Sequence, residues 1–185
     1  MINDGSRQRS QITRLTTSFE TEVDHAALQS AFTLTNIDTN QQVAALAVVP
    51  FNQNGKTSAV LTFGCGVSVI NRMRIAGRGN SLANGNYRPD ILASQLQASN
   101  GGTTMNSDYI FGGQTAGQPN SDDFFRLYGD VKGDGRLNVI DLHVSIPTFF
   151  NSAAYREGLD VDGDGVINAL NVNSLIPAFR SRGQR

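Results

Sequence analysis

The feature that most constrains this chain is a repeat near its C-terminus. Residues 130–150 and 160–180 align without a gap, and matched positions are thirty residues apart (160 − 130 = 30). The repeat indicates two copies of one structural unit, because chance does not keep so many positions in register. The identical pairs are Asp130/Asp160, Val131/Val161, Gly133/Gly163, Asp134/Asp164, Gly135/Gly165, Asn138/Asn168, Ile146/Ile176, Pro147/Pro177 and Phe149/Phe179.

Each copy starts with a stretch that has the spacing of a calcium-binding loop. Such a loop needs oxygen ligands at its first, third, fifth, ninth and twelfth positions, a main-chain carbonyl at the seventh and glycine at the sixth. Calcium takes about six to eight oxygens, and carboxylates two residues apart on a tight turn converge on one point. The alternative is an ordinary Asp/Gly turn, but two copies in register, each followed by an apolar helical pattern, favour the calcium loop. The sequence therefore predicts two calcium ions, one in each loop.

The first loop departs from this pattern at its third position. That position is Lys132, a cation where an acceptor is expected. We therefore expect its side chain to swing outward and leave its place to water. The ligands that we predict in this loop are Asp130, Asp134, the carbonyl of Arg136, Asn138 and Asp141.

The second loop departs from the pattern at its twelfth position, where Asn171 replaces a carboxylate. An amide side chain offers one oxygen to an ion, whereas a carboxylate can offer two. The ligands that we predict in this loop are Asp160, Asp162, Asp164, the carbonyl of Val166, Asn168 and Asn171.

Residues 122–180 resemble a type I dockerin module, in which two loop-helix calcium motifs each use only the exiting helix of an EF-hand. Besides the loops, the resemblance rests on the lead-in at 122–129 and on the Ile-Pro endings at 146–150 and 176–179. It implies a non-catalytic structural or interaction module of a secreted or cell-surface protein, with a cohesin-type β-sandwich as partner. Such modules often follow an immunoglobulin-like sandwich in large exported bacterial proteins.

In this family the tenth and eleventh loop positions contribute to partner choice. Here they are Val139-Ile140 in the first loop and Ala169-Leu170 in the second. We expect apolar side chains at these helix starts to pack on a β-sheet surface. That surface is either a cohesin-like partner or this chain's own residues 1–112, and the short linker slightly favours the intramolecular alternative.

Residues 1–112 have the pattern of β-strands. Short segments rich in Thr, Val and Ile are separated by turn residues such as Asn54-Gly55. Residues 43–51 are nearly all apolar, as expected for a strand covered on both faces. The turn before Tyr87 resembles the tyrosine corner of immunoglobulin-like sandwiches. We predict an immunoglobulin-like antiparallel β-sandwich at 1–112, a polar linker at 113–121 and a dockerin-like pair of half EF-hands at 122–185.

Composition excludes several classes of function. The chain has 15 basic and 16 acidic residues, and its net charge of -1 gives no field for holding nucleic acid. No apolar run is long enough to span a membrane, and the first residues lack the apolar segment of a signal peptide. Cys65 is the single cysteine, so the chain forms no internal disulfide. The resemblance to dockerin modules implies an exported protein. We therefore expect the chain to be a fragment of such a protein, located outside the cell or at the cell surface.

We predict that the chain is not an enzyme, because no catalytic constellation is evident. The two histidines, His25 and His143, lie outside any hydrolase or metalloprotease motif. The alternative function is an accessory carbohydrate-binding module of a polysaccharide-degrading system. Sugar-binding faces usually need stacked Trp or Tyr, and the chain has no Trp and four Tyr. Three arginines on one strand could bind an acidic polysaccharide, but a solvated strand face that protects a sheet edge is the favoured interpretation: Arg72, Arg74 and Arg78.

Overall fold

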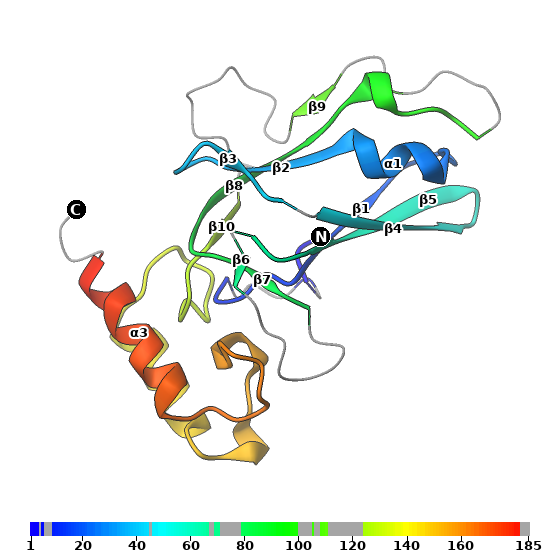
Figure 1. The fold of residues 1–185 in the computed structure, drawn as a ribbon. Helices are drawn as coiled ribbons and strands as arrows, with labels where there is room; N and C mark the ends of the chain where they lie inside the picture. Colours follow the sequence, from blue (N-terminus) through cyan, green and yellow to red (C-terminus); the bar gives the residue numbers. More distant parts are fainter. Residues whose placement is uncertain are drawn as a thin grey trace.

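The computed structural model shows two larger antiparallel β-sheets, a third sheet of two short strands, and a small helical module at the C-terminal end (Figure 1). The residues that it describes are 1–3, 5, 9–44, 46–66, 69–70, 79–99, 105, 108–110 and 124–181. The predicted linker at 113–121, the first two residues of the lead-in and the predicted arginine-rich strand face lie outside the described residues.

The first sheet contains three strands in the order β1 (Arg14–Ser18), β5 (Lys56–Phe63) and β4 (Leu46–Gln53). Strands β4 and β5 form a hairpin whose turn is Asn54-Gly55, as the sequence predicts. Both turn residues have positive φ, 55° and 73°, which is the backbone conformation that this dipeptide adopts most easily.

Strand β5 buries alternate residues, whereas β4 does not have the two covered faces that its sequence predicts. Ala59, Leu61 and Phe63 of β5 are buried in the core. In β4, by contrast, Val49 and Phe51 are exposed. Alternate residues of β4 are exposed, so one face of the strand is open to water and the prediction of a strand buried on both faces is wrong.

The second sheet has the order β10 (Phe124–Arg126), β8 (Gly85–Ile91), β2 (Phe32–Asn36) and β3 (Gln41–Gln42). A further strand, β9 (Tyr109–Ile110), also pairs with β8. The short helix α1 (His25–Ala31) leads into β2, and the Asp24 side chain caps it by accepting a hydrogen bond from the Ala26 N–H at 3.0 Å. Three shorter elements complete this part of the chain: β6 (Val69–Ile70), β7 (Ser81–Leu82) and the 3₁₀ turn η1 (Ala93–Gln95).

Side chains from both sheets meet in one hydrophobic core. Leu15 and Leu61 come from the first sheet, and Phe32, Leu34 and Tyr87 come from the second. The five-stranded sheet lies above the three-stranded sheet in the view of Figure 1. The described residues therefore form a two-layered antiparallel β structure, which is the coarser part of the predicted fold.

Tyr87 makes the hydrogen bond that the sequence predicts for a tyrosine corner. Its ring is fully buried and stacks on Phe124, with ring centroids 5.7 Å apart. Its hydroxyl donates to the main-chain carbonyl of Ala83, four residues earlier, at 2.9 Å. Burial raises the pKa of the Tyr87 phenol to about 12, so the hydroxyl remains a donor over the whole neutral range.

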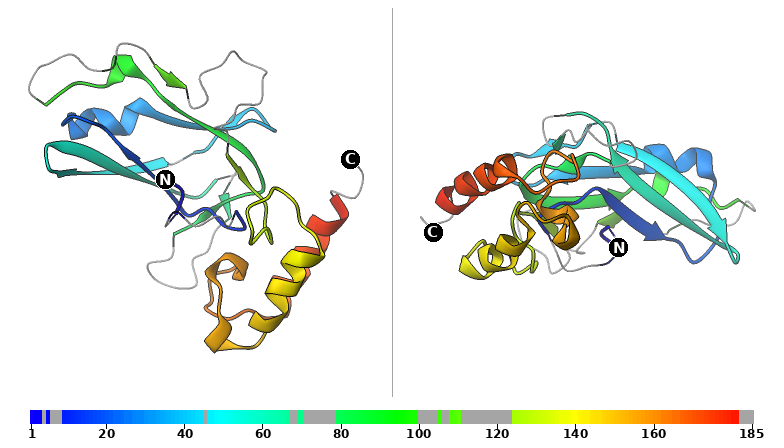
Figure 2. Two further views of the ribbon diagram at one scale, coloured as in Figure 1. Left: turned by 180° about the vertical axis from the view of Figure 1, so that it is seen from behind. Right: turned by 90° about the horizontal axis from the view of Figure 1, so that it is seen from below.

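The C-terminal module consists of two loops, each followed by a helix, as the repeat predicts. Helix α2 (Val139–Ser145) follows the first loop and helix α3 (Ala169–Ser181) follows the second, and the two helices lie side by side (Figure 2). The segment between them contains only short 3₁₀ turns, namely η2 (Ile146–Thr148), η3 (Ser152–Ala154) and η4 (Glu157–Leu159).

Residues 9–11 connect this module to the sheets. The main-chain N–H of Arg9 donates to the carbonyl of Asp130 at 3.0 Å, and the side-chain amide of Gln11 donates to the carbonyl of Asp160. Ser10 lies between them: its hydroxyl donates to the Gly158 carbonyl and accepts the N–H of Gly129. The first residue of each loop is thus held by the N-terminal part of the chain.

Strand β10 provides a second connection, because it pairs with β8 and leads directly into the first loop. The predicted division at residue 122 stays a prediction, but the pairing of residues 124–126 joins them to the sheet rather than to the helices.

We predict that Tyr87→Phe lowers the free energy of unfolding of the sheets by about 1 kcal/mol, because it leaves the Ala83 carbonyl without its buried donor. Urea unfolding followed by far-ultraviolet circular dichroism measures this loss. Ser18→Ala is the control, since it removes an exposed hydroxyl contact with Ser58 that water can replace. An equal effect of the two variants would contradict a structural role for the Tyr87 bond.

Candidate metal centre

The first loop is organised around the carboxylate of Asp130. This side chain is fully buried and accepts main-chain hydrogen bonds from Gly133 at 2.7 Å, Asp134 at 3.2 Å and Gly135 at 2.8 Å. Gly133 and Gly135 have φ values of 74° and 76°, which other residues rarely adopt. The loop wraps around one carboxylate because glycines allow its N–H groups to turn inward.

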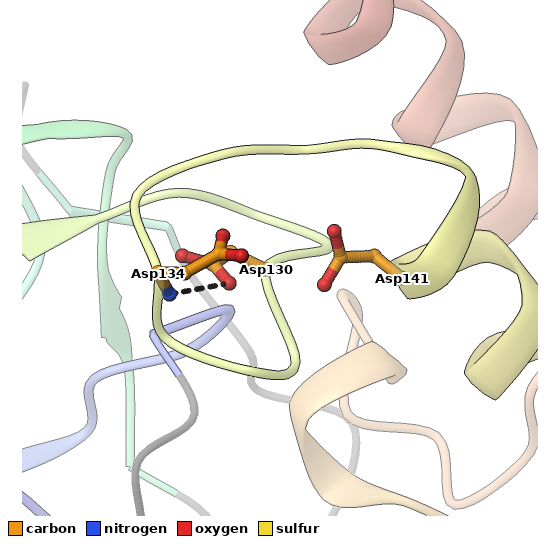
Figure 3. A group of neighbouring side chains, drawn as sticks. All are labelled: Asp130, Asp134 and Asp141. Atoms are coloured by element: carbon orange, nitrogen blue, oxygen red, sulfur yellow. Dashed lines mark hydrogen bonds between the residues drawn. The ribbon is translucent and has the colours of Figure 1, made fainter.

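Asp134 and Asp141 bring two further carboxylates to the same place (Figure 3). One oxygen from each of Asp130, Asp134 and Asp141 lies within 4.8 Å of the others. Asp141 is fully buried, and its Oδ1 atom has no hydrogen-bond partner among the described residues. A buried carboxylate oxygen without a donor is costly, so this cluster fits a bound cation.

The start of helix α2 fixes the position of Asp141. Asn138 is the N-cap, and its side chain accepts the N–H of Ile140 at 2.9 Å. Asp141 completes a capping box, because its Oδ2 atom accepts the N–H of Asn138 at 3.0 Å. Helix capping therefore uses one oxygen of Asp141 and leaves the other for the cluster.

Lys132 does not swing outward, so that prediction is wrong. Its ammonium nitrogen lies 2.8 Å from Oδ2 of Asp134 and 3.8 Å from Oδ2 of Asp141. The hydrogen bond from Lys132 lowers the pKa of Asp134, and the same bond raises the pKa of Lys132. The side chain is directed towards these two carboxylates of its own loop.

The second loop repeats the same main-chain template. The carboxylate of Asp160 is fully buried and accepts hydrogen bonds from the N–H groups of Gly163 at 2.8 Å, Asp164 at 3.2 Å and Gly165 at 2.9 Å. The hydroxyl of Tyr155 adds a fourth donor at 2.7 Å.

Three carboxylates also meet in the second loop. One oxygen from each of Asp160, Asp162 and Asp164 lies within 4.8 Å of the others. Residues 160–171 contain no Lys or Arg. A cluster of hard oxygen donors in a loop whose own sequence has no basic residue fits a calcium ion.

The twelfth residue of this loop differs from its counterpart in the first. Oδ1 of Asn171 accepts the N–H of Asn168 at 2.7 Å, and its Nδ2 atom lies 3.4 Å from Oδ1 of Asp162. The amide thus uses its single oxygen for helix capping and directs its NH₂ group towards a carboxylate. Ligation by Asn171, predicted from the spacing, stays a prediction and requires this oxygen to be shared.

The remaining predicted ligands are held by the loop itself. The N–H groups of Arg136 and Val166 donate to Oδ1 of Asp134 and of Asp164, at 3.0 and 2.9 Å. Asn168 is engaged twice, because its Oδ1 accepts the Leu170 N–H at 2.8 Å and its Nδ2 donates to Asp164 at 3.2 Å. These bonds position the carboxylates and show that the ninth residue of each loop also caps a helix.

Two tyrosines support the site, and the sequence patterns did not predict this role for either of them. Tyr128 donates its hydroxyl to the Leu159 carbonyl at 2.6 Å and lies 3.1 Å from the Asn171 carbonyl, so it links both ends of the second loop. Tyr155 is the donor to Asp160. The repeat offset could have indicated Tyr155, since it maps onto Phe125 (155 − 125 = 30), whose ring lies beside Gly135.

A comparison with known families agrees with this geometry. Residues 128–179 match the model of the family described as Dockerin type I domain. No curated protein and no solved structure matches the chain. This segment therefore resembles dockerin type I modules, a class of non-catalytic, calcium-binding docking domains, and the predicted resemblance is confirmed for residues 128–179.

We predict that Asn171→Asp lowers the dissociation constant for calcium about tenfold, because one oxygen can cap helix α3 while the other binds the ion. Calorimetric titration of metal-stripped protein measures this change. Asn173→Asp is the matched control: it adds the same charge at an exposed position on α3. Equal affinities of the two variants would show that the twelfth position does not bind the ion.

We also predict that chelation of calcium removes the part of the helical circular dichroism signal that comes from helix α3, and that calcium, but not millimolar magnesium, restores it. Residues 124–181 bury little apolar surface of their own, so ion binding must supply a large part of their folding free energy. A helical signal that is unchanged after chelation would contradict a structural role for calcium.

Proposed function

We propose that this chain is the calcium-dependent docking part of a secreted or cell-surface protein, and that its dockerin module binds a cohesin-type β-sandwich partner. In this proposal residues 1–112 form an immunoglobulin-like scaffold that carries the module. The proposal rests on one observation: apolar side chains are exposed at equivalent positions in the two loop-helix units.

These side chains stand at the first turn of each helix. Val139 and Ile140 are 74% and 54% exposed, and Leu170 is 48% exposed. Ala169 is exposed as well. Apolar side chains that are rigidly held and open to water favour association with a partner surface.

The structure favours an external partner over the intramolecular alternative. The four side chains are exposed, so the described part of residues 1–112 leaves them accessible to a partner. The contact between the module and the sheets is made instead by residues 9–11 and by strand β10. The module is thus held against the sheets with its two helix starts open to a second protein.

The carbohydrate-binding alternative has less support. The described residues contain an apolar cavity of about 650 Å³ lined by Leu15, Phe32, Phe124 and Tyr109, among others. Its walls are mainly aliphatic and aromatic core side chains. Sugar stacking requires instead an exposed platform of aromatic side chains.

No helix among the described residues is long and apolar enough to cross a membrane.

We predict that Ile140→Asp combined with Leu170→Asp abolishes retention of the chain on immobilised type I cohesin modules, while the calcium affinity and the melting temperature of the sheets stay unchanged. In the complex each introduced aspartate would be buried without a partner. The free energy needed to remove its charge from water would prevent docking. Biolayer interferometry against a panel of cohesin modules measures the loss.

The control is Val49→Asp, which puts the same charge on an exposed apolar position of strand β4. Retention of the double variant at the wild-type level, or failure of every cohesin module to retain the wild-type chain, would contradict the proposed function.

A further inference from the structure

The two loops have the same main-chain template. In each, the first aspartate accepts the N–H of the sixth-position glycine, at 2.8 Å for Gly135 on Asp130 and 2.9 Å for Gly165 on Asp160. In each, the twelfth residue accepts the N–H of the ninth. Any difference in ion binding therefore comes from the side chains at the centre of the loops.

The loops differ most in charge. Residues 130–141 contain three aspartates, Lys132 and Arg136, which gives a net charge of −3 + 2 = −1. Residues 160–171 contain three aspartates and no basic residue, which gives −3. The third position is where the charge reverses, because Lys132 in the first loop corresponds to Asp162 in the second.

The ammonium group of Lys132 lies beside two of the carboxylates that a calcium ion would need. Its ammonium group is bonded to Asp134 at 2.8 Å and lies 3.8 Å from Asp141, the two carboxylates that would complete the first site beside Asp130. The Lys132 side chain is only 28% exposed, so the ammonium is partly withdrawn from water. A divalent ion could enter this loop only by displacing a like charge from its own ligands.

We propose that the two loops are closed by different cations: the ammonium of Lys132 closes the first loop, and calcium binds in the second loop alone. The chain then binds one calcium ion rather than the two that its spacing predicts. This inference rests on the proposed calcium-dependent function, and it assigns that dependence to residues 160–171.

Titration of the metal-stripped whole chain with calcium tests this assignment, by calorimetry for the stoichiometry and by ¹H–¹⁵N spectra for the location. The Gly135 and Gly165 amides report on one loop each, because each donates to the first aspartate of its own loop. For the wild-type chain we expect one ion per chain and a saturable shift of Gly165, with Gly135 unchanged.

The variant Lys132→Asn places an oxygen donor at the third position and removes the ammonium group. We expect it to bind two ions and to show saturable shifts of both glycine amides. Arg136→Gln is the matched control: it removes the same charge from the same loop but leaves the third position occupied by Lys132, so it should still bind one ion. Circular dichroism in calcium checks that each variant is folded, and Lys132→Asp repeats the test with a carboxylate.

Three results would overturn the inference. Two ions in the wild-type chain, with Gly135 and Gly165 shifting together, would show that Lys132 yields to calcium and would leave the proposed function standing. One ion in both Lys132 variants would show that something other than the ammonium group keeps calcium out. No calcium in either loop would overturn the inference and the calcium-dependent function together.

Discussion

The structure of the C-terminal module depends on one interaction made twice: a buried aspartate carboxylate that accepts the N–H groups of two glycines. Asp130 and Asp160 each turn their loop around themselves in this way. Their main-chain carbonyls face the other way and accept hydrogen bonds from Arg9 and Gln11. The same two residues therefore organise the loops and attach the module to the sheets.

The hydrogen bonds that the two loops share fix the course of the main chain, but they do not determine which cation the carboxylates bind. Once the glycine N–H groups and the capping bonds at Asn138 and Asn168 are satisfied, the remaining carboxylate oxygens need a positive charge. The first loop has this charge in its own sequence at Lys132, whereas the second has three carboxylates and no basic residue. Two copies of one motif can thus fold alike and still differ in whether they need a metal ion.

The sequence predicted those elements that are determined by interactions between residues close together in the chain. The loop spacing predicted both helix starts, Asn54-Gly55 predicted its hairpin, and the turn before Tyr87 predicted the hydroxyl bond to Ala83. The failures concern contacts between distant residues. The exposure of Val49 depends on which face of β4 the rest of the molecule covers, and the inward turn of Lys132 depends on where Asp134 and Asp141 lie in space. No spacing rule pairs residues 9–11 with loops more than a hundred residues away.

Amide hydrogen exchange of the loop glycines, with calcium and after chelation, tests most directly whether different cations close the two loops. The account predicts that the Gly163 and Gly165 amides lose their protection when calcium is removed, whereas Gly133 and Gly135 keep most of theirs because Lys132 and the bond from Arg9 to Asp130 remain. An equal loss of protection in both loops, or no loss in the second, would contradict the account.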